Sequence, residues 1–231
     1  MRLAIECIRQ IASKSDKVIL FHSATGKDSI ALLDLCYPYF KEIVCVYMYM
    51  VEGLEHIDKY IIWAKQKYPK ARFISVPHYA LTQYIKDGAF GCEQDPKQRI
   101  KTLSDITEEV RAMTGIEWAI YGFKQTDSLN RRIMLRTYEG QMINEATRKA
   151  YPLSLYKNKD VEAYIKYKRL IPSLKYGNGQ SQGTDVSNIP FLLFCRDKYP
   201  QDLERVIARF PEVEKILFDY LNYDPKYDQG D

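Results

Sequence analysis

A short polar segment near the N-terminus has residue types that bind a phosphate chain. It reads Ser23-Ala24-Thr25-Gly26-Lys27-Asp28-Ser29 and lies between an apolar run and a helical pattern. A glycine allows close backbone approach, a lysine adds positive charge, and hydroxyls and the N–H groups of a helix start donate hydrogen bonds. An aspartate beside a polyanion implies a bridging divalent cation, so magnesium is the expected metal. The segment predicts a phosphate-binding loop; a polar turn in which Thr25 or Asp28 caps the helix is the structural alternative.

A second set of basic residues follows a later apolar run that ends at Gly122. The carboxyl ends of parallel strands share one edge, so Lys124 and Arg131 could reach the same ligand as the loop. Their donors match phosphate oxygens and would stabilise the charge that develops on a leaving pyrophosphate. We predict that these two residues act with the lysine of the loop, whereas Arg132 and Arg136 lie on a solvated helix face.

Two better-known phosphate-binding patterns do not fit the loop. The Walker A pattern needs a glycine five residues before Gly26, but Phe21 stands there. It also needs Ser or Thr directly after the lysine, but Asp28 stands there. The dinucleotide pattern G-x-G-x-x-G has no match either, so neither class is indicated.

Apolar runs of strand length alternate with helical patterns through the first 150 residues. The strand-like runs are 18–21, 43–48, 72–76 and 118–121, and the helical patterns are 2–14, the stretch from the loop to Pro38, 55–68 and 99–113. Strands that are apolar throughout indicate a parallel sheet covered on both faces. We therefore predict an α/β fold with a doubly wound, mostly parallel, Rossmann-like sheet over residues 1–150.

Residues 151–231 differ in character and predict a helical C-terminal region packed on this core. Asp160 can cap one helix, and two further helical patterns are separated near Pro211. A polar, glycine-punctuated stretch lies between the first helix and these two patterns. Its Lys175, Gly177 and Gly179 would form either a flap over a nucleotide or a plain surface loop.

The composition is that of an ordinary soluble globular chain, with 231 residues of which 46% are hydrophobic and 28% charged. The net charge of +4 is too small to argue for nucleic acid by itself. The N-terminus lacks the apolar stretch of a signal peptide, and the longest apolar run, residues 43–51, is too short for a membrane helix. These features predict a cytoplasmic protein with no membrane partner.

The five cysteines are Cys7, Cys36, Cys45, Cys92 and Cys195. Their number is odd and none has C-x-x-C spacing, so neither a disulfide framework, a zinc site nor an iron–sulfur cluster is expected. A reducing compartment fits best. Of the histidines, His22 directly precedes the loop, and His56 and His78 have no partners at metal spacing.

The loop resembles the PP-loop of the adenine nucleotide alpha hydrolase superfamily, whose usual form is S-G-G-K-D-S or S-x-S-G-x-x-S. Ser23, Thr25, Gly26, Lys27 and Ser29 carry this likeness, with Asp28 between the last two. Members bind or cleave adenine nucleotides at the bond between the α-phosphate and its neighbour, and they include ATP pyrophosphatases, tRNA-thiolating enzymes and phosphoadenylyl-sulfate (PAPS) reductases. The resemblance implies that the loop binds the nucleotide and that the second strand, at Tyr47, lies beside the adenine and contacts it largely through backbone groups; a generic buried strand is the alternative explanation of these residues.

Further segments resemble the PAPS reductase branch, so that the likeness spans about residues 16–180. Residues 121–131 resemble G-x-R-x-x-x-S-x-x-R, with Lys124 where arginine is usual. Residues 151–165 resemble P-L-x-x-W-x-x-x-D-V-W-x-Y-I, with Tyr156 and Glu162 in place of the tryptophans, and residues 171–177 continue the match. The branch's E-C-G-[IL]-H segment, whose cysteine attacks the sulfonate sulfur, has no counterpart, and Cys195 lies in an apolar setting that favours a buried, inert thiol.

These observations predict an enzyme that binds ATP with magnesium and reacts at the α-phosphate, releasing pyrophosphate or adenylating a second substrate. One alternative is a PAPS reductase whose thiol comes from Cys195 or from a partner. Another is a non-catalytic nucleotide-binding or assembly module. The partners expected are an adenine nucleotide, an unidentified second substrate or partner protein, and a second copy of the chain; nucleic acid is disfavoured.

The predicted site falls into three groups of residues. The catalytic groups are Lys27, Lys124 and Arg131; the nucleotide-binding groups are Ser23, Ala24, Thr25, Gly26, Lys27, Asp28, Ser29, Tyr47 and Gly122; the metal contact, made through the phosphates, is Asp28.

Overall fold

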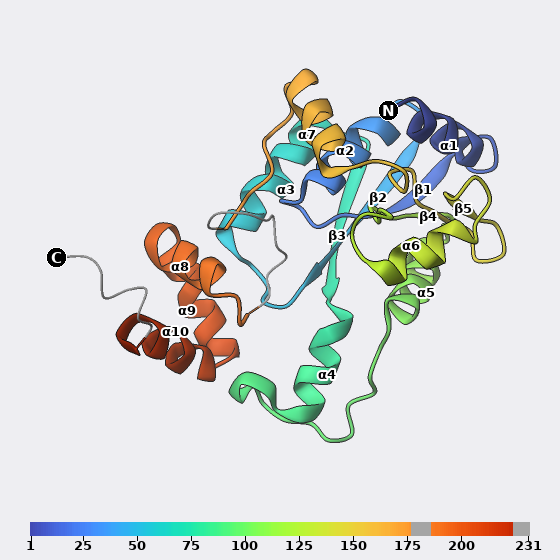
Figure 1. Cartoon of the computed structure of the whole chain (residues 1–231). Helices are drawn as coiled ribbons and strands as arrows, with labels where there is room; N and C mark the ends of the chain where they lie inside the picture. The colour runs from blue at the N-terminus through green and yellow to red at the C-terminus, as the bar shows by residue number, and fades with distance from the viewer. Residues whose placement is uncertain (177–185, 224–231) are drawn as a thin grey trace. The chain divides into compact units, whose positions relative to one another are not determined.

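The computed structural model describes residues 1–176 and 186–223 (Figure 1). The contacts within the chain divide it into two units. The first unit contains residues 1–48, 60–76 and 107–174, and the second contains residues 49–59, 77–106 and 175–231. This division differs from the boundary expected near residue 150. Helix α7 (Asn158–Tyr167) belongs to the first unit, and two segments that follow strands of the sheet belong to the second.

The sheet has six strands in the order β3-β2-β1-β4-β6-β5. They are β1 (Lys17–Phe21), β2 (Glu42–Tyr49), β3 (Ala71–Pro77), β4 (Ala119–Ile120), β5 (Ile143–Asn144) and β6 (Lys149–Ala150). β1 pairs in parallel with β2 and β4, β4 pairs in parallel with β6, and β5 is antiparallel to β6. The predicted α/β fold with a mostly parallel sheet is confirmed, and the short β5–β6 pair is an addition to it.

The strand order reverses beside β1. From β1 the chain adds β2 and then β3 on one side, and it later adds β4 on the other side. In open α/β sheets, ligands bind outside the carboxyl ends of the strands at such a reversal. The loops after β1 and β4 are therefore the two segments that the topology places at the expected site.

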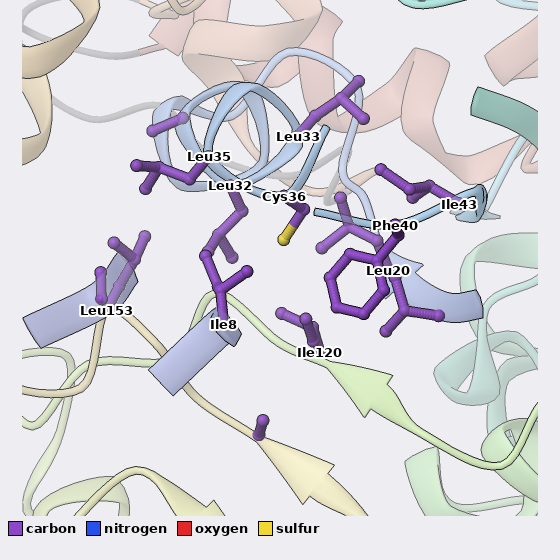
Figure 2. Packing of buried hydrophobic residues seen from close by; sticks show 14 of the residues in the cluster. Ile8, Leu20, Leu32, Leu33, Leu35, Cys36, Phe40, Ile43, Ile120 and Leu153 are labelled. Atoms are coloured by element: carbon purple, nitrogen blue, oxygen red, sulfur yellow. The ribbon is translucent and has the colours of Figure 1, made fainter. Parts of the chain in front are cut away.

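One face of the sheet is covered by helices α1 (Arg2–Ala12), α2 (Lys27–Cys36) and α7, which share an apolar cluster with it (Figure 2). In this cluster Leu20 of β1 and Ile120 of β4 pack with Leu32 of α2, all without exposed surface. Burying a leucine-sized side chain stabilises by about 1.5–3 kcal/mol, so the apolar residues of α2 fix this helix on the sheet. The N-terminus of α2 is thereby positioned by the core.

The remaining helices of the chain are α3 (Glu55–Lys67), α4 (Tyr79–Asp87), the 3₁₀ turn η1 (Ala89–Gly91), α5 (Leu103–Thr114), α6 (Leu129–Arg136), α8 (Ile189–Lys198), α9 (Pro200–Arg209) and α10 (Glu212–Tyr223). Several begin at polar caps: Ser128 Oγ accepts from the Arg131 N–H in α6, and Asp160 accepts from the Lys157 N–H at α7. Helix α7 thus begins two residues before Asp160, with Lys157 as its N-cap, and Asp160 stabilises the helix start from the third helical position.

The second unit is mainly helical. The predicted interruption near Pro211 is confirmed, because α9 ends at Arg209 and α10 begins at Glu212. The ring of Phe210 between them lies 6.1 Å from that of Tyr84 and 6.4 Å from that of Phe90. Helices α4 and α8 were not predicted. Over the described ranges, every helix is too short or too polar to cross a lipid bilayer.

Candidate functional site

The predicted loop lies at the carboxyl edge of three neighbouring strands. Residues 23–29 follow β1, Tyr47 lies near the end of β2, and Gly122 follows β4. β1 pairs in parallel with both of the other strands, so the three ends share one edge. The His22 N–H donates to the Val46 carbonyl at 2.9 Å and extends the ladder to the start of the loop. The structure therefore brings the loop, Tyr47 and Gly122 to one edge.

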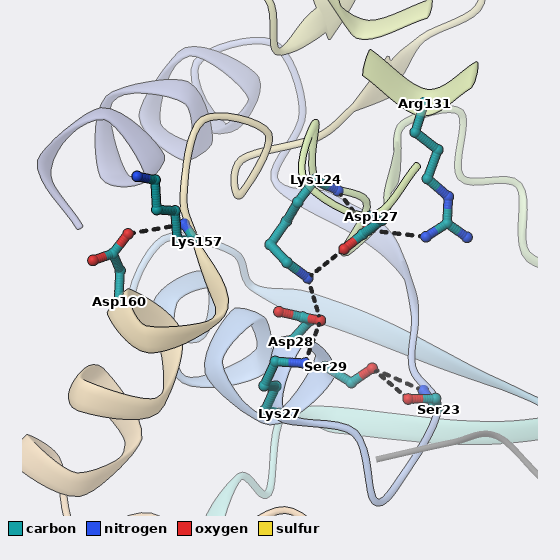
Figure 3. Close-up of polar contacts among 9 residues, drawn as sticks. All are labelled: Ser23, Lys27, Asp28, Ser29, Lys124, Asp127, Arg131, Lys157 and Asp160. Atoms are coloured by element: carbon teal, nitrogen blue, oxygen red, sulfur yellow. Dashed lines mark hydrogen bonds and ion pairs between the residues drawn. The ribbon is translucent and has the colours of Figure 1, made fainter. Parts of the chain in front are cut away.

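The loop folds back on the first turn of α2 through its own serines (Figure 3). The Ser23 N–H donates to Ser29 Oγ at 2.9 Å, and the two hydroxyl oxygens lie 3.0 Å apart. Ala24 has a left-handed φ of 57°, a conformation that costs a non-glycine residue roughly 1–2 kcal/mol. The two serines, predicted as phosphate donors, are thus engaged in shaping the loop.

Helix α2 begins directly after the loop, with Gly26 as its N-cap. No side chain in the described part of the chain caps this end. The first N–H groups of a helix have no intrahelical partner, and the helix dipole adds partial positive charge there. The start of α2 therefore has the features that bind an anion.

Lys124 is the centre of a charged network beside this helix start (Figure 3). It is 1% exposed, and its Nζ lies 2.6 Å from Asp28 Oδ2 and 3.1 Å from Asp127 Oδ1. Arg131 Nη1 donates to Asp127 Oδ2 at 2.9 Å. Lys124 was predicted to hold phosphate directly, but two carboxylates already compensate its charge.

The two oxygens of Asp28 have different surroundings. Its Oδ2 accepts a hydrogen bond from Lys124 and also lies 3.5 Å from Lys27 Nζ. Two ammonium groups beside one carboxylate oxygen repel a further cation. The other oxygen, Asp28 Oδ1, is buried without a hydrogen-bond partner among the described residues, so a magnesium contact of Asp28 through the phosphates stays a prediction.

Gly122 allows the end of β4 to approach α2. A Cβ atom built on Gly122 would lie 3.1 Å from the Asp28 Cβ and 3.6 Å from Leu32 Cδ1. The first distance is shorter than an ordinary van der Waals contact, so a side chain here would push the strand end and the helix start apart. Gly122 thus acts on the site through packing.

The network retains a surplus of positive charge. Three cations, Lys27, Lys124 and Arg131, face two carboxylates, Asp28 and Asp127. Burial alone would raise the pKa of Asp127, but the N–H and ammonium of Lys124, together with Arg131, hold it below its usual value. Asp127 is therefore ionised near neutral pH, and the network has one more cation than carboxylates to offer an anionic ligand.

Arg131 is the accessible member of the network. Its side chain is 42% exposed, and its guanidinium carbon lies 4.0 Å from the centre of the Phe123 ring. The ring and the Asp127 carboxylate together orient the guanidinium plane. Arg131 can thus present donors to a ligand without leaving its partners.

His22 and Tyr47 are buried beside the loop. The Ala24 N–H donates to His22 Nδ1 at 3.0 Å, and burial lowers the pKa of His22 to about 4. The imidazole is therefore neutral near pH 7 and adds no charge for phosphate. Since the Tyr47 side chain is buried as well, the end of β2 offers its backbone more readily than this ring.

Sequence reasoning missed Asp127, which joins Lys124 to Arg131. The signal was present, because Asp127 lies three residues after Lys124 and four before Arg131, the spacings at which charged side chains meet around a helical turn. The partner of Lys124 on the loop, Asp28, is 96 residues away in the sequence, and no local pattern indicates it.

The segment at 151–165 contributes by fixing α2. Asp34, in the last turns of α2, accepts hydrogen bonds from Tyr164 Oη at 2.6 Å and from Tyr68 Oη at 2.9 Å. Val161 and Ile165 of α7 are buried in the same apolar cluster as α2. The residues that match the family pattern here therefore hold the helix that follows the loop.

Cys195 and the polar stretch near residue 177 were the other candidates. Cys195 is fully buried in α8 of the second unit, and burial raises the pKa of its thiol to about 12. Gly177 and Gly179, predicted as part of a flap or surface loop, lie outside the described residues.

Comparison with known proteins identifies one matching family model. The model of the phosphoadenosine phosphosulfate reductase domain matches residues 18–179. No curated protein sequence matches the chain.

Similar solved structures share little sequence with this chain. The U34-tRNA thiolase NcsA from Methanococcus maripaludis, with its 4Fe-4S cluster, is 15% identical with a TM-score of 0.45, and the match covers 93% of this chain and 79% of the thiolase. The NH3-dependent NAD synthetase from Campylobacter jejuni subsp. jejuni NCTC 11168, in complex with the nitrate ion, is 14% identical with a TM-score of 0.49, and the match covers 93% and 95% of the two chains.

The first of these structures corrects the cofactor expectation, which was magnesium with ATP and neither an iron–sulfur cluster nor zinc. A similar solved structure carries a 4Fe-4S cluster, so the exclusion drawn from cysteine spacing is wrong. The physical reason is that cluster ligands need only converge in space, and a fold can bring them from distant segments. Among the residues that this structure describes, no group of three His, Cys, Asp or Glu side chains could hold a metal ion.

Proposed function

Because this chain belongs to the phosphoadenosine phosphosulfate reductase domain family, we propose that it binds ATP at residues 23–29 and reacts at the α-phosphate. The reaction would release pyrophosphate or transfer the adenylyl group to a second substrate. The observation that carries this proposal is the surplus of positive charge beside an uncapped helix start, at the reversal of the strand order.

In this reaction a nucleophilic oxygen, from water or from the second substrate, attacks the α-phosphorus. The bond to the bridging oxygen breaks, and pyrophosphate leaves with the electron pair. Lys27 and Arg131 would hold phosphate oxygens, and the N–H groups at the start of α2 would bind the phosphate chain. Lys124 would act as a positioning residue, since its ammonium is paired with Asp28 and Asp127.

The second candidate is PAPS reduction, which the family supports. A thiolate would have to attack the sulfonate sulfur, and Cys195 is a poor source of one. With a pKa raised to about 12 by burial, only about one molecule in 10⁵ would carry the thiolate at pH 7. A reductase function would therefore need the thiol of a partner.

The test supplies purified protein with ATP labelled at the α- or γ-phosphate, with EDTA or with an added divalent cation. Labelled AMP or an adenylated product, together with pyrophosphate, supports the proposal; ADP with phosphate contradicts it. PAPS with thioredoxin is assayed in parallel, and sulfite release would favour the reductase. ATP binding without any product would favour a non-catalytic binding module.

A pair of variants on α6 tests whether the accessible cation binds the nucleotide. Arg131→Gln should weaken ATP binding about tenfold, as expected for a lost charge-assisted hydrogen bond. Arg136→Gln removes the same charge from the exposed end of the same helix and should leave the affinity within about twofold. Equal losses of ATP affinity in both variants would mean that the total positive charge of α6 affects binding, and not a contact from Arg131.

A further inference from the structure

The chain that leaves α7 returns to the phosphate loop. Arg169 has a left-handed φ of 51°, and the Leu170 N–H donates to the Ile165 carbonyl at 3.0 Å, which ends the helix and turns the backbone. Leu170 is buried in the apolar cluster of the first unit. Residues 170–174, named the strap here, therefore start from a fixed point in the core.

Two hydrogen bonds hold the other end of the strap. Tyr60 Oη, on α3, donates to the Pro172 carbonyl at 2.8 Å. Two residues later, the Leu174 N–H donates to the carbonyl of Thr25, inside the loop, at 3.1 Å. All these residues belong to the first unit. The strap thus joins α3 to one peptide group of the loop.

That peptide group lies directly at the start of α2. The Thr25 carbonyl and the Gly26 N–H belong to one planar peptide unit, and no described peptide bond is cis. In a trans peptide the C=O and the N–H point in opposite directions. The hydrogen bond from Leu174 therefore fixes the carbonyl toward the strap and the Gly26 N–H away from it.

Gly26 makes the opposite orientation accessible. Turning the peptide over rotates ψ of Thr25 and φ of Gly26, and φ of Gly26, now −78°, would become positive. Glycine adopts positive φ about as readily as negative φ, so its backbone opposes this rotation little. The turned peptide would point the negative end of its carbonyl to the side that its N–H now occupies, next to an anion-binding helix start.

We propose that the strap holds the Thr25–Gly26 peptide in the orientation that accepts phosphate, and that Tyr60 is the positioning residue that holds the strap. This inference rests on the proposed nucleotide function of the loop. It assigns a role in ligand binding to residues outside both the loop and the charged network.

The first test is Tyr60→Phe, which removes one oxygen atom. The dissociation constants of ATP and of tripolyphosphate should rise about three- to tenfold, the factor expected when one hydrogen bond is lost. Tyr167→Phe, the same change at a tyrosine that is 83% exposed, should alter neither value. Hydrogen exchange of the Leu174 amide should become faster in Tyr60→Phe alone.

Adenosine separates this role from a general loosening of the fold, because it lacks phosphate. If the strap acts on the peptide orientation, Tyr60→Phe weakens ATP and tripolyphosphate and leaves any adenosine affinity unchanged. Equal weakening of all three ligands would overturn the proposal. Wild-type affinities in Tyr60→Phe would overturn it as well.

A second pair of variants removes the donor on the strap itself. Leu174→Pro lacks the N–H, whereas Leu174→Ala keeps it and loses only side-chain contacts. Weaker tripolyphosphate binding in Leu174→Pro than in Leu174→Ala supports the proposal, and equal binding contradicts it. Should Leu174→Pro not fold, the Tyr60→Phe measurements decide. Absence of ATP binding in the wild type would instead refute the proposed function, and the exchange rate of Leu174 would still report on the strap.

Discussion

Each of the two units contains a buried charged network, and the two networks differ in how completely the protein satisfies them. In the first unit Lys124 is paired with Asp28 and Asp127, while Arg131 remains partly exposed at the edge. In the second unit His56 and Asp202 are buried together, with His56 Nδ1 2.7 Å from Asp202 Oδ2. The comparison shows what separates a site for a ligand from a structural contact.

The second network is closed in the sense that its charge is balanced, because its one carboxylate, Asp202, is paired with one cation: Arg205 Nη1 donates to Asp202 Oδ1 at 3.1 Å, from a side chain that is 46% exposed. Asp202 of α9 accepts the N–H groups of Glu55 and His56 at 2.7 and 3.1 Å, so it caps the N-terminus of α3 from a distant segment. The other ring nitrogen of His56 lies 2.9 Å from Tyr176 Oη. The rings of Phe191, Phe194 and Tyr199 surround the imidazole.

The first network differs because part of its positive charge is not compensated. Its cations outnumber its carboxylates, and the excess lies beside helix N–H groups and an accessible guanidinium. Burial of a charged group is common to both networks and is weak evidence for function. The informative feature is charge that the protein itself does not compensate.

The largest expected effect is the loss of Asp202. Asp202→Ala removes the cap of α3 and leaves His56 buried without its partner, which should lower the free energy of unfolding by about 3–5 kcal/mol. Denaturant unfolding measures it, with Asp197→Ala, at a half-exposed position, as the control. A loss below about 1 kcal/mol would mean that the second network is not structural.

The next largest effect on stability is expected from His22, a buried side chain beside the predicted phosphate loop. Its folded pKa of about 4 is below the unfolded value of about 6.5, so the unfolded chain takes up the proton first as the pH falls. Stability from this group is present above pH 6.5 and is lost between pH 6.5 and 4, by about 3 kcal/mol.

His22→Asn tests this pH dependence. The amide oxygen of asparagine can accept the N–H two residues on, as His22 Nδ1 does, but it does not titrate. The fall in unfolding free energy between pH 7.5 and 4 should be smaller in the variant, although His56 and His78, whose pKa values are also lowered by burial, still contribute. If the unfolding free energy fell by the same amount in the variant as in the wild type, protonation of His22 would cost the folded state no free energy.

The smallest effect on stability is expected at Lys124. Lys124→Met removes the ammonium that joins the two carboxylates, but Arg131 still pairs with Asp127 and Lys27 still lies beside Asp28. Both carboxylates are also about one-fifth exposed and can be hydrated, so the loss should be about 1–3 kcal/mol. ATP binding should nevertheless weaken, because Lys27 and Arg131 would then only balance the two carboxylates and the surplus of positive charge would be gone. Lys159→Met, at an exposed position of α7, is the control for both measurements. A larger loss of stability than in Asp202→Ala would remove the distinction between the two networks.

The strand, loop and helix at the site could be predicted because their signals are local. The apolar run before residue 23 and the glycine, lysine and hydroxyls of the loop lie within a dozen residues. The mostly parallel sheet followed from the alternation of strands and helices, whereas the order of its strands was not predicted. In contrast, β4 forms only two residues of ladder where a four-residue apolar run was expected, because pairing depends on its neighbours.

The partners of the charged side chains could not be predicted. Asp28 and Lys124 are 96 residues apart, and His56 and Asp202 are 146 residues apart. No period or spacing in the sequence links such pairs. His56 therefore carried no signal, although the structure gives it a carboxylate, a tyrosine hydroxyl and a surrounding of aromatic rings.

The carboxylate of Asp34 has a consequence for how the site can respond to a nucleotide. Two tyrosine hydroxyls fasten it, so the far end of α2 cannot slide along its axis without breaking both bonds. Helix α2 therefore keeps its position when a nucleotide binds, and residues 23–26, which precede the helix, must make any adjustment. Induced fit in this protein would be a movement of the turn before the helix, with the helix as its stationary reference.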